Sequence, residues 1–222
     1  MLKIITVDGP SGVGKGTLCQ RLCDITGFHF LDSGAIYRSL AYGVMAQQLD
    51  ADNELALNDI IALAASLPVN FRAGQIFYEQ QDITLAIRNE DVAAIASKVA
   101  AIPAVRTALL QRQKAFAQAP GLVADGRDMG TVVFPQADLK LFLTASAKIR
   151  AERRVNQLKN QGVIANIDQI ISDIEARDER DRNRSVAPLL PAEDAIVIDT
   201  SLLTIEQVVD NAVKIMQERA VL

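Results

Sequence analysis

Hydrophobic and polar positions follow two different periods along this chain, and the order of these periods predicts its architecture. Short runs of branched apolar residues are typical of buried strands, and apolar residues three or four positions apart are typical of amphipathic helices. The predicted strands cover 2–7, 29–31, 122–125, 139–143 and 195–199; the predicted helices cover about 16–26, 33–48, 54–66, 90–101, 103–119, 146–159, 167–184 and 204–219. Because strands alternate with helices, we predict an α/β fold whose parallel β-sheet has helices on both faces.

The segment 67–88 departs from that alternation. Apolar residues stand at every second position in three short runs, which are Val69 and Phe71, then Ile76 and Tyr78, then Ile83, Leu85 and Ile87. Alternation of this kind, broken by short turns, indicates an antiparallel meander rather than a strand–helix–strand unit. We therefore predict an antiparallel β subdomain inserted into the parallel fold.

A glycine-rich loop joins the first predicted strand to the first predicted helix. Its residues are Gly9, Pro10, Ser11, Gly12, Val13, Gly14, Lys15, Gly16 and Thr17. Glycines let successive backbone N–H groups point at one anion, and the following helix adds its positive N-terminal end. This is the context of a phosphate-binding P-loop, in which the lysine reaches the β- and γ-phosphates of ATP. The alternative is a glycine-rich turn that binds nothing.

In the general P-loop motif a hydroxyl directly follows the lysine and helps to hold Mg²⁺. In this chain Gly16 occupies that position and Thr17 comes next. We therefore expect Thr17 to be the hydroxyl on the metal side, with ATP and Mg²⁺ as the bound cofactors. The Gly-Lys-Gly-Thr form resembles nucleoside monophosphate kinases rather than GTP switches.

Charge is distributed unevenly along the chain, and this limits the class of ligand. The net charge is −4, yet residues 146–184 contain nine Lys and Arg against seven Asp and Glu. A local basic cluster in an acidic protein favours a small phosphorylated ligand over DNA or RNA. Because the chain has only two cysteines, no signal peptide and no long apolar run, we expect a cytoplasmic protein that binds no membrane. We also expect a monomer.

Three further segments place polar side chains at the ends of predicted elements. Asp125-Gly126-Arg127-Asp128-Met129-Gly130 follows a buried strand, where the glycines allow a close approach to a ligand. Arg177, Asp181 and Arg184 share one face of a predicted helix, and guanidinium groups suit bidentate binding of phosphate. The segment 32–38 starts a helix, whose N-terminus is a second anion site. The alternatives are a solvated turn, a salt-bridged surface and an ordinary capped helix.

Together these segments resemble the bacterial cytidylate kinases, a branch of the P-loop nucleoside monophosphate kinases. The matching stretches are 8–17, 31–38, 124–131 and 177–184, in order over most of the chain. The resemblance implies transfer of the ATP γ-phosphoryl group to the phosphate of CMP or dCMP, which gives ADP and CDP or dCDP. In such enzymes the protein mainly positions two anions in line and neutralises their charge.

The resemblance also implies roles for individual residues. The expected catalytic residues are Lys15, Arg127 and Arg154. The residues expected around the phosphate and sugar of CMP are Ser33, Arg38, Arg127, Arg177 and Asp181. The residues expected to read cytosine are Ser97, Arg106, Asp128 and Arg184. A carboxylate near the exocyclic amine of cytosine would reject uracil, which presents a carbonyl oxygen there.

The same resemblance suggests a division of the chain into three parts. The core P-loop domain would comprise 1–62, 90–145 and 185–222, the monophosphate-binding insert 63–89, and a closing helical lid 146–184. Another small-molecule P-loop kinase and a nucleotide-sensing switch are the alternatives to a cytidylate kinase. The guanine-specific pattern Asn-Lys-x-Asp is absent from the sequence, which weakens the second alternative. The acidic net charge argues against an ATPase that acts on nucleic acid.

Overall fold

The computed structural model describes residues 2–72, 74–160 and 162–222, and the chain forms two compact units. The first unit comprises Met1–Leu31 together with Ala115–Leu222, and the second unit is Asp32–Lys114. Each unit has its own β-sheet, so the fold is described one unit at a time.

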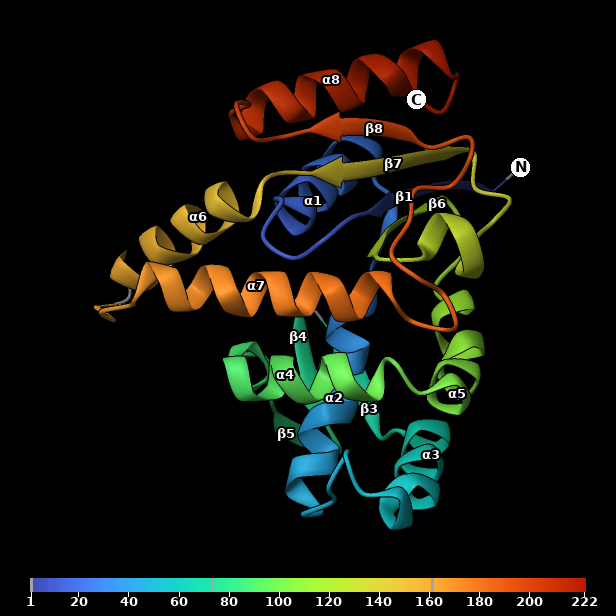
Figure 1. Cartoon of the computed structure of the whole chain (residues 1–222). Coiled ribbons are helices and arrows are strands. Elements are labelled where there is room, and N and C mark those ends of the chain that lie inside the picture. Colours follow the sequence, from blue (N-terminus) through green and yellow to red (C-terminus); the bar gives the residue numbers. More distant parts are fainter. Residues whose placement is uncertain (1, 73, 161) are drawn as a thin grey trace. The chain divides into compact units, whose positions relative to one another are not determined.

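The first unit is built on a five-stranded sheet in the order β2-β6-β1-β7-β8 (Figure 1). The strands are β1 (Lys3–Asp8), β2 (His29–Asp32), β6 (Gly121–Gly126), β7 (Leu139–Thr144) and β8 (Ile196–Asp199). β1 pairs in parallel with β6 and with β7, and β7 pairs in parallel with β8, which confirms the predicted parallel sheet. Asp8 lies opposite Gly126, so the glycine-rich loop and the segment after β6 leave the sheet at the same edge.

The core of the first unit holds these strand ends in place. Helices α1 (Lys15–Thr26) and α8 (Ile205–Glu218) pack against each other, and their apolar residues join those of β1, β6 and β7 in one buried cluster. In α8 the buried residues Val208, Ala212 and Met216 repeat every fourth position, as an amphipathic helix requires. Cys19 and Cys23 are buried in the same cluster, where they pack as small apolar residues.

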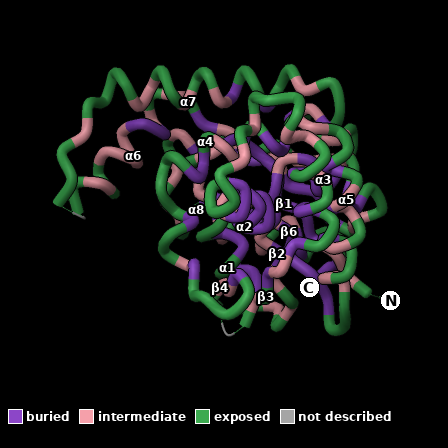
Figure 2. Tube along the Cα trace, turned by 90° about the horizontal axis from the view of Figure 1, so that it is seen from below, coloured by how far each residue is buried: buried purple, intermediate pink, exposed green. Residues whose placement is uncertain are grey.

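Helices α6 (Ala147–Asn160) and α7 (Ile167–Arg182) also belong to the first unit and pack against each other. α7 ends two residues before its predicted end, and the Asn183 N–H donates to the Glu179 carbonyl (3.0 Å). Figure 2 shows that most of α7 is exposed, in contrast to the buried β1 and β6. The contact between the two helices includes an ion pair in which Arg150 donates to both oxygens of Asp178, with both side chains almost fully buried.

Replacing Asp178 with alanine is expected to lower the free energy of unfolding by about 3–5 kcal/mol, because the buried Arg150 guanidinium would lose its counter-charge. Urea unfolding followed by far-UV circular dichroism measures this loss. Asp173→Ala is the matched control on the same helix, since Asp173 is exposed and should cost at most about 0.5 kcal/mol. Equal losses in the two variants would show that the ion pair contributes nothing.

The second unit combines helices with a small antiparallel sheet. Its helices are α2 (Ser33–Ala46), α3 (Leu57–Ser66), α4 (Glu90–Val99) and α5 (Pro103–Lys114). Its sheet has the order β3 (Val69–Arg72), β4 (Gln75–Tyr78) and β5 (Gln81–Asp82), which confirms the predicted antiparallel subdomain. Among the described residues, no single helix is long and apolar enough to cross a membrane; only α4 and α5 taken together reach that length and composition, and they are bent by 102°.

The prediction of a strand across Ile83, Leu85 and Ile87 is wrong. β5 ends at Asp82, and Ala86–Arg88 form a 3₁₀ turn. The Thr84 hydroxyl accepts the Ile76 N–H (2.9 Å), and the Ile87 N–H turns back to the Ile83 carbonyl (3.0 Å). Ile83 and Ile87 are buried while Leu85 is 81% exposed, which is the pattern of one helical turn. Three apolar residues at alternate positions are compatible with a short strand and with a single helical turn, so the sequence pattern could not separate the two.

Candidate active site

The glycine-rich loop adopts a backbone that only glycine tolerates at several positions. Gly9, Gly12 and Gly14 have φ angles of 145°, 79° and 97°. A Cβ atom on Gly9 would lie 2.2 Å from the Leu143 carbonyl oxygen, so a side chain there would collide with β7. The loop leads directly into the N-terminus of α1, where Gly16 and Thr17 are exposed. This is the strand–loop–helix arrangement that was predicted for a P-loop.

Lys15 is folded over this loop. Its Nζ donates to the Pro10 carbonyl (2.9 Å) and lies 3.8 Å from Oδ1 of Asp125, at the end of β6. Burial lowers the pKa of Lys15, because the side chain is only 7% exposed, and the Asp125 carboxylate opposes that shift only in part. A bound phosphate would add negative charge beside the ammonium group and would stabilise its charged form.

A buried carboxylate links the end of β1 to the segment after β6. Asp8 accepts the backbone N–H groups of Met129 and Gly130, both at 2.8 Å. Burial raises the pKa of Asp8 to about 7, and the charge of Asp128 adds to this, while the two N–H groups and Lys15 oppose it. Asp8 lay inside a matching sequence stretch, but no local pattern identified its role.

The segment after β6 is a π-helical turn rather than a simple loop. Met129–Val133 form this turn, in which the Val132 and Val133 N–H groups share the Asp128 carbonyl (2.9 and 3.2 Å). Single π-turns are rare and are frequent at functional sites. The turn begins directly after Arg127 and Asp128, so it determines how these two side chains leave the sheet.

Three of the predicted substrate-binding residues meet in the first unit. Arg127 and Arg184 each donate to one oxygen of Asp181, which is only 1% exposed. Burial alone would raise the pKa of Asp181, but Arg127 and Arg184, with a smaller contribution from Arg177, hold it below its usual value. Arg184 lies beyond the end of α7, so the chain after the helix brings it to Asp181.

Two arginines of α6 support the loop in ways that the sequence did not indicate: Arg150 contacts it directly, and Arg153 acts through Thr200. Arg150 donates to the Ser11 carbonyl (3.2 Å), and Arg153 donates to the Thr200 carbonyl (2.6 Å). The Thr200 hydroxyl in turn donates to the Val13 carbonyl (3.1 Å). Arg154, one of the two predicted catalytic arginines, donates to Gln157 on its own helix (2.8 Å). Hydrogen bonds from α6 and from the segment after β8 therefore hold the backbone of the loop in place.

Asp128 and Arg177 also belong to the first unit. The other four predicted substrate-binding residues lie in the second unit. Asp32 caps α2 by accepting the Ala35 N–H (2.9 Å), and the Ser33 hydroxyl donates to Gln113 (2.6 Å). Arg106 on α5 donates to the Ala100 carbonyl (3.1 Å), and its guanidinium carbon lies 5.6 Å from the centre of the Tyr37 ring. The remaining two are Ser97, buried on α4, and Arg38, half-buried on α2.

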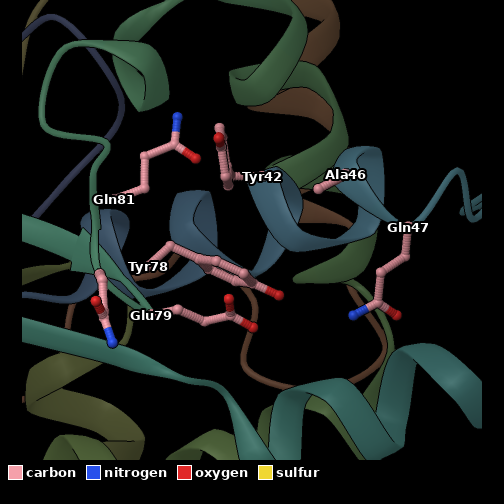
Figure 3. Close-up of a pocket in the computed structure, with 7 residues that line it drawn as sticks. Tyr42, Ala46, Gln47, Tyr78, Glu79 and Gln81 are labelled. Atoms are coloured by element: carbon pink, nitrogen blue, oxygen red, sulfur yellow. The ribbon is translucent and has the colours of Figure 1, made fainter.

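A separate pocket of about 600 Å³ lies in the second unit (Figure 3). It is lined by Tyr42, Ala46, Gln47, Tyr78, Glu79, Gln80 and Gln81. The Tyr42 and Tyr78 ring centres are 5.5 Å apart. No predicted site residue is among those that line this pocket, so it is distinct from the phosphate-binding site predicted from the sequence.

Known proteins resemble this chain over almost its whole length. The family model described as cytidylate kinase matches residues 5–218. A cytidylate kinase from Shewanella pealeana is 54% identical over 215 residues, which cover 94% of this chain and 92% of that protein. One from Enterobacter sp. (strain 638) is 51% identical over 223 residues, which cover 99% of this chain and 97% of that protein. The chain, with its P-loop on a parallel sheet, therefore belongs to the cytidylate kinase family of ATP-dependent nucleoside monophosphate kinases.

Proposed function

We propose that this chain transfers the γ-phosphoryl group of ATP to CMP or dCMP, with the P-loop as the donor site and the segment after β6 as part of the acceptor site. The observation that carries the proposal is that the P-loop and the segment after β6 leave the sheet at the same edge. They follow the neighbouring strands β1 and β6, and Lys15 Nζ lies 3.8 Å from Oδ1 of Asp125. A transfer enzyme needs its two phosphate sites side by side, because the reaction depends on in-line positioning and on neutralised charge.

At the donor site, the backbone of Gly9–Gly14 and Lys15 would hold the β- and γ-phosphates. The positive φ angles of the loop glycines support this, since such a loop can present successive N–H groups to one anion. Thr17 would hold Mg²⁺, and its exposed position on the first turn of α1 fits that role. When bound, Mg²⁺ would neutralise charge on the phosphate oxygens.

At the acceptor site, Arg38, Arg127 and Arg177 would surround the phosphate and sugar of CMP together with Ser33, and Asp181 would accept a sugar hydroxyl. Asp128, Arg184, Ser97 and Arg106 would read the base. The contacts around Asp181 support part of this set, because they hold Arg127 and Arg184 in fixed orientations before a substrate arrives. Fixed guanidinium groups lose little entropy when they bind phosphate.

Residues 146–184 would act as a lid that excludes water during transfer, and Arg154 would reach the transferred phosphoryl group from it.

We also propose that the protein is a cytoplasmic monomer that serves pyrimidine nucleotide metabolism. Its chain would divide into three parts, which are the core, the insert 63–89 and the lid. Sedimentation of the purified protein tests the monomer.

The proposed function is tested by ADP release with a panel of acceptors: CMP, dCMP, UMP, AMP and shikimate. CMP and dCMP should be phosphorylated with far higher kcat/KM than the others. A higher kcat/KM for UMP, AMP or shikimate would instead assign the chain a different acceptor.

Asp128→Asn is expected to reduce kcat/KM for CMP by about 10- to 100-fold, the value of one hydrogen bond to a charged group. The preference for CMP over UMP should narrow, because an amide can also donate to the uracil carbonyl. Steady-state kinetics with both nucleotides measures the ratio. If CMP turnover falls while the preference is unchanged, Asp128 does not read the base.

A further inference from the structure

We propose that Asp8 is a positioning residue, which fixes Arg127 and Asp128 relative to the P-loop by clamping the start of the π-helical turn. The inference rests on the proposed function, since it concerns how the acceptor segment is held beside the donor loop. Asp8 is the last residue of β1, immediately before Gly9. It accepts hydrogen bonds from Met129 and Gly130, which lie 121 and 122 positions further along the chain.

The geometry of the clamp requires a carboxylate. One oxygen of Asp8 accepts the Met129 N–H and the other accepts the Gly130 N–H, so both oxygens are used. The first N–H groups of a helical turn have no acceptor within the turn. The two oxygens of Asp8 are the acceptors for two of these groups, those of Met129 and Gly130. An asparagine could accept only one of them and would turn an NH₂ group towards the other.

Close packing around the turn leaves it little freedom to relax. A Cβ atom on Gly126 would lie 2.6 Å from Met129 Cγ, and one on Gly130 would lie 2.9 Å from the Thr6 hydroxyl oxygen. The backbone of the turn at Gly130 therefore packs closely against β1, and the Met129 side chain packs against the backbone at the end of β6. If the clamp opened, Arg127 and Asp128, which precede the turn, would lose the anchor that sets their direction.

Burial sets how the clamp responds to pH, and two charged groups that face Asp8 modify the response. Asp128 and Lys15 both act on it, from the segment after β6 and from α1. Because the pKa of Asp8 is raised to about 7, mainly by burial, the ionised carboxylate that accepts both N–H groups is lost as the pH falls below 7. The kcat/KM for CMP should fall through the same range.

The test compares Asp8→Asn with Asp138→Asn. Asp138 is a matched control, because it also accepts a backbone N–H of β1, that of Ile4 (2.9 Å), but at the opposite end of the strand. Asp8→Asn should lower kcat/KM for CMP by about 10- to 100-fold, as expected for a displaced binding group, with a change of less than about threefold in KM for ATP. Asp138→Asn should keep the wild-type values.

Two further readouts separate positioning from a loss of stability. The step near pH 7 in kcat/KM should be present in wild type and in Asp138→Asn but absent from Asp8→Asn. The phosphate of CMP itself titrates near pH 6, roughly equally for all three proteins, so the ratio of the profiles isolates Asp8. Hydrogen exchange of the Met129 and Gly130 amides should accelerate in Asp8→Asn alone.

An unchanged kcat/KM for CMP, an unchanged pH profile or unchanged exchange at Met129 and Gly130 in a folded Asp8→Asn protein would overturn the inference. Wild type and Asp138→Asn test the proposed function independently: if neither phosphorylates CMP, the proposed function fails. The exchange measurement still reports on the clamp in that case, because it needs no substrate.

Discussion

Lys15→Ala is expected to lower kcat for phosphoryl transfer from ATP to CMP by at least about two to three orders of magnitude, the scale of one lost charge-stabilising group. Lys15 is the P-loop lysine, and it is already held over the loop by the Pro10 carbonyl. A preorganised charge of this kind acts on the phosphoryl group without having to reorient during the reaction. A coupled assay for ADP measures kcat.

The control for this variant is Lys214→Ala, which removes an exposed lysine from α8. It should retain full activity, and both variants should give the far-UV circular dichroism spectrum of the wild type. Activity of Lys15→Ala within about threefold of wild type would contradict the P-loop assignment.

Asp181→Ala is expected to cost about 3–5 kcal/mol of the free energy of unfolding, because Arg127 and Arg184 would lose the carboxylate that they share. Use of CMP should be lost with it, since both arginines are proposed to contact this substrate. Urea unfolding and kinetics at several CMP concentrations measure the two effects. Glu175→Ala, an exposed change on the same helix, should leave both unaffected.

The pH dependence of stability gives Asp181 a second signature. Its pKa is held below the usual value, so its contribution to stability is present above about pH 4, the pKa of an unfolded aspartate. That contribution is lost as the pH falls through the lowered pKa of the folded state. Wild type should therefore lose stability below about pH 4 more steeply than Asp181→Ala does. Parallel curves would contradict the pairing.

Local patterns in the sequence were enough to predict the sheet and the P-loop. Continuous apolar runs produce buried parallel strands, and a Gly-rich segment between strand and helix has few other structural outcomes. The error at Ile83–Ile87 arose where a pattern was short: burial of Ile83 and Ile87 fits both a strand and a helical turn. Only the hydrogen bonds of Thr84 and Ile87 decide between them.

The supports of the candidate site could not be predicted in this way. Asp8, Asp178 and Thr200 act through partners that lie 28 to 187 positions away along the chain. Their local sequences contain no pattern that separates them from ordinary strand-end or surface residues. The substrate-contacting roles came from the resemblance to a family and stay predictions until the variants above are measured.

The division into two units also determines what spectroscopy can detect without added labels. The chain has no tryptophan, and its three tyrosines, Tyr37, Tyr42 and Tyr78, all belong to the second unit. Its two cysteines, Cys19 and Cys23, belong to the first, where burial raises the pKa of Cys23 to about 11 and suppresses the reactive thiolate. Tyrosine emission thus reports unfolding of one unit and thiol labelling reports opening of the other. Coincident denaturation curves would identify a single cooperative unit.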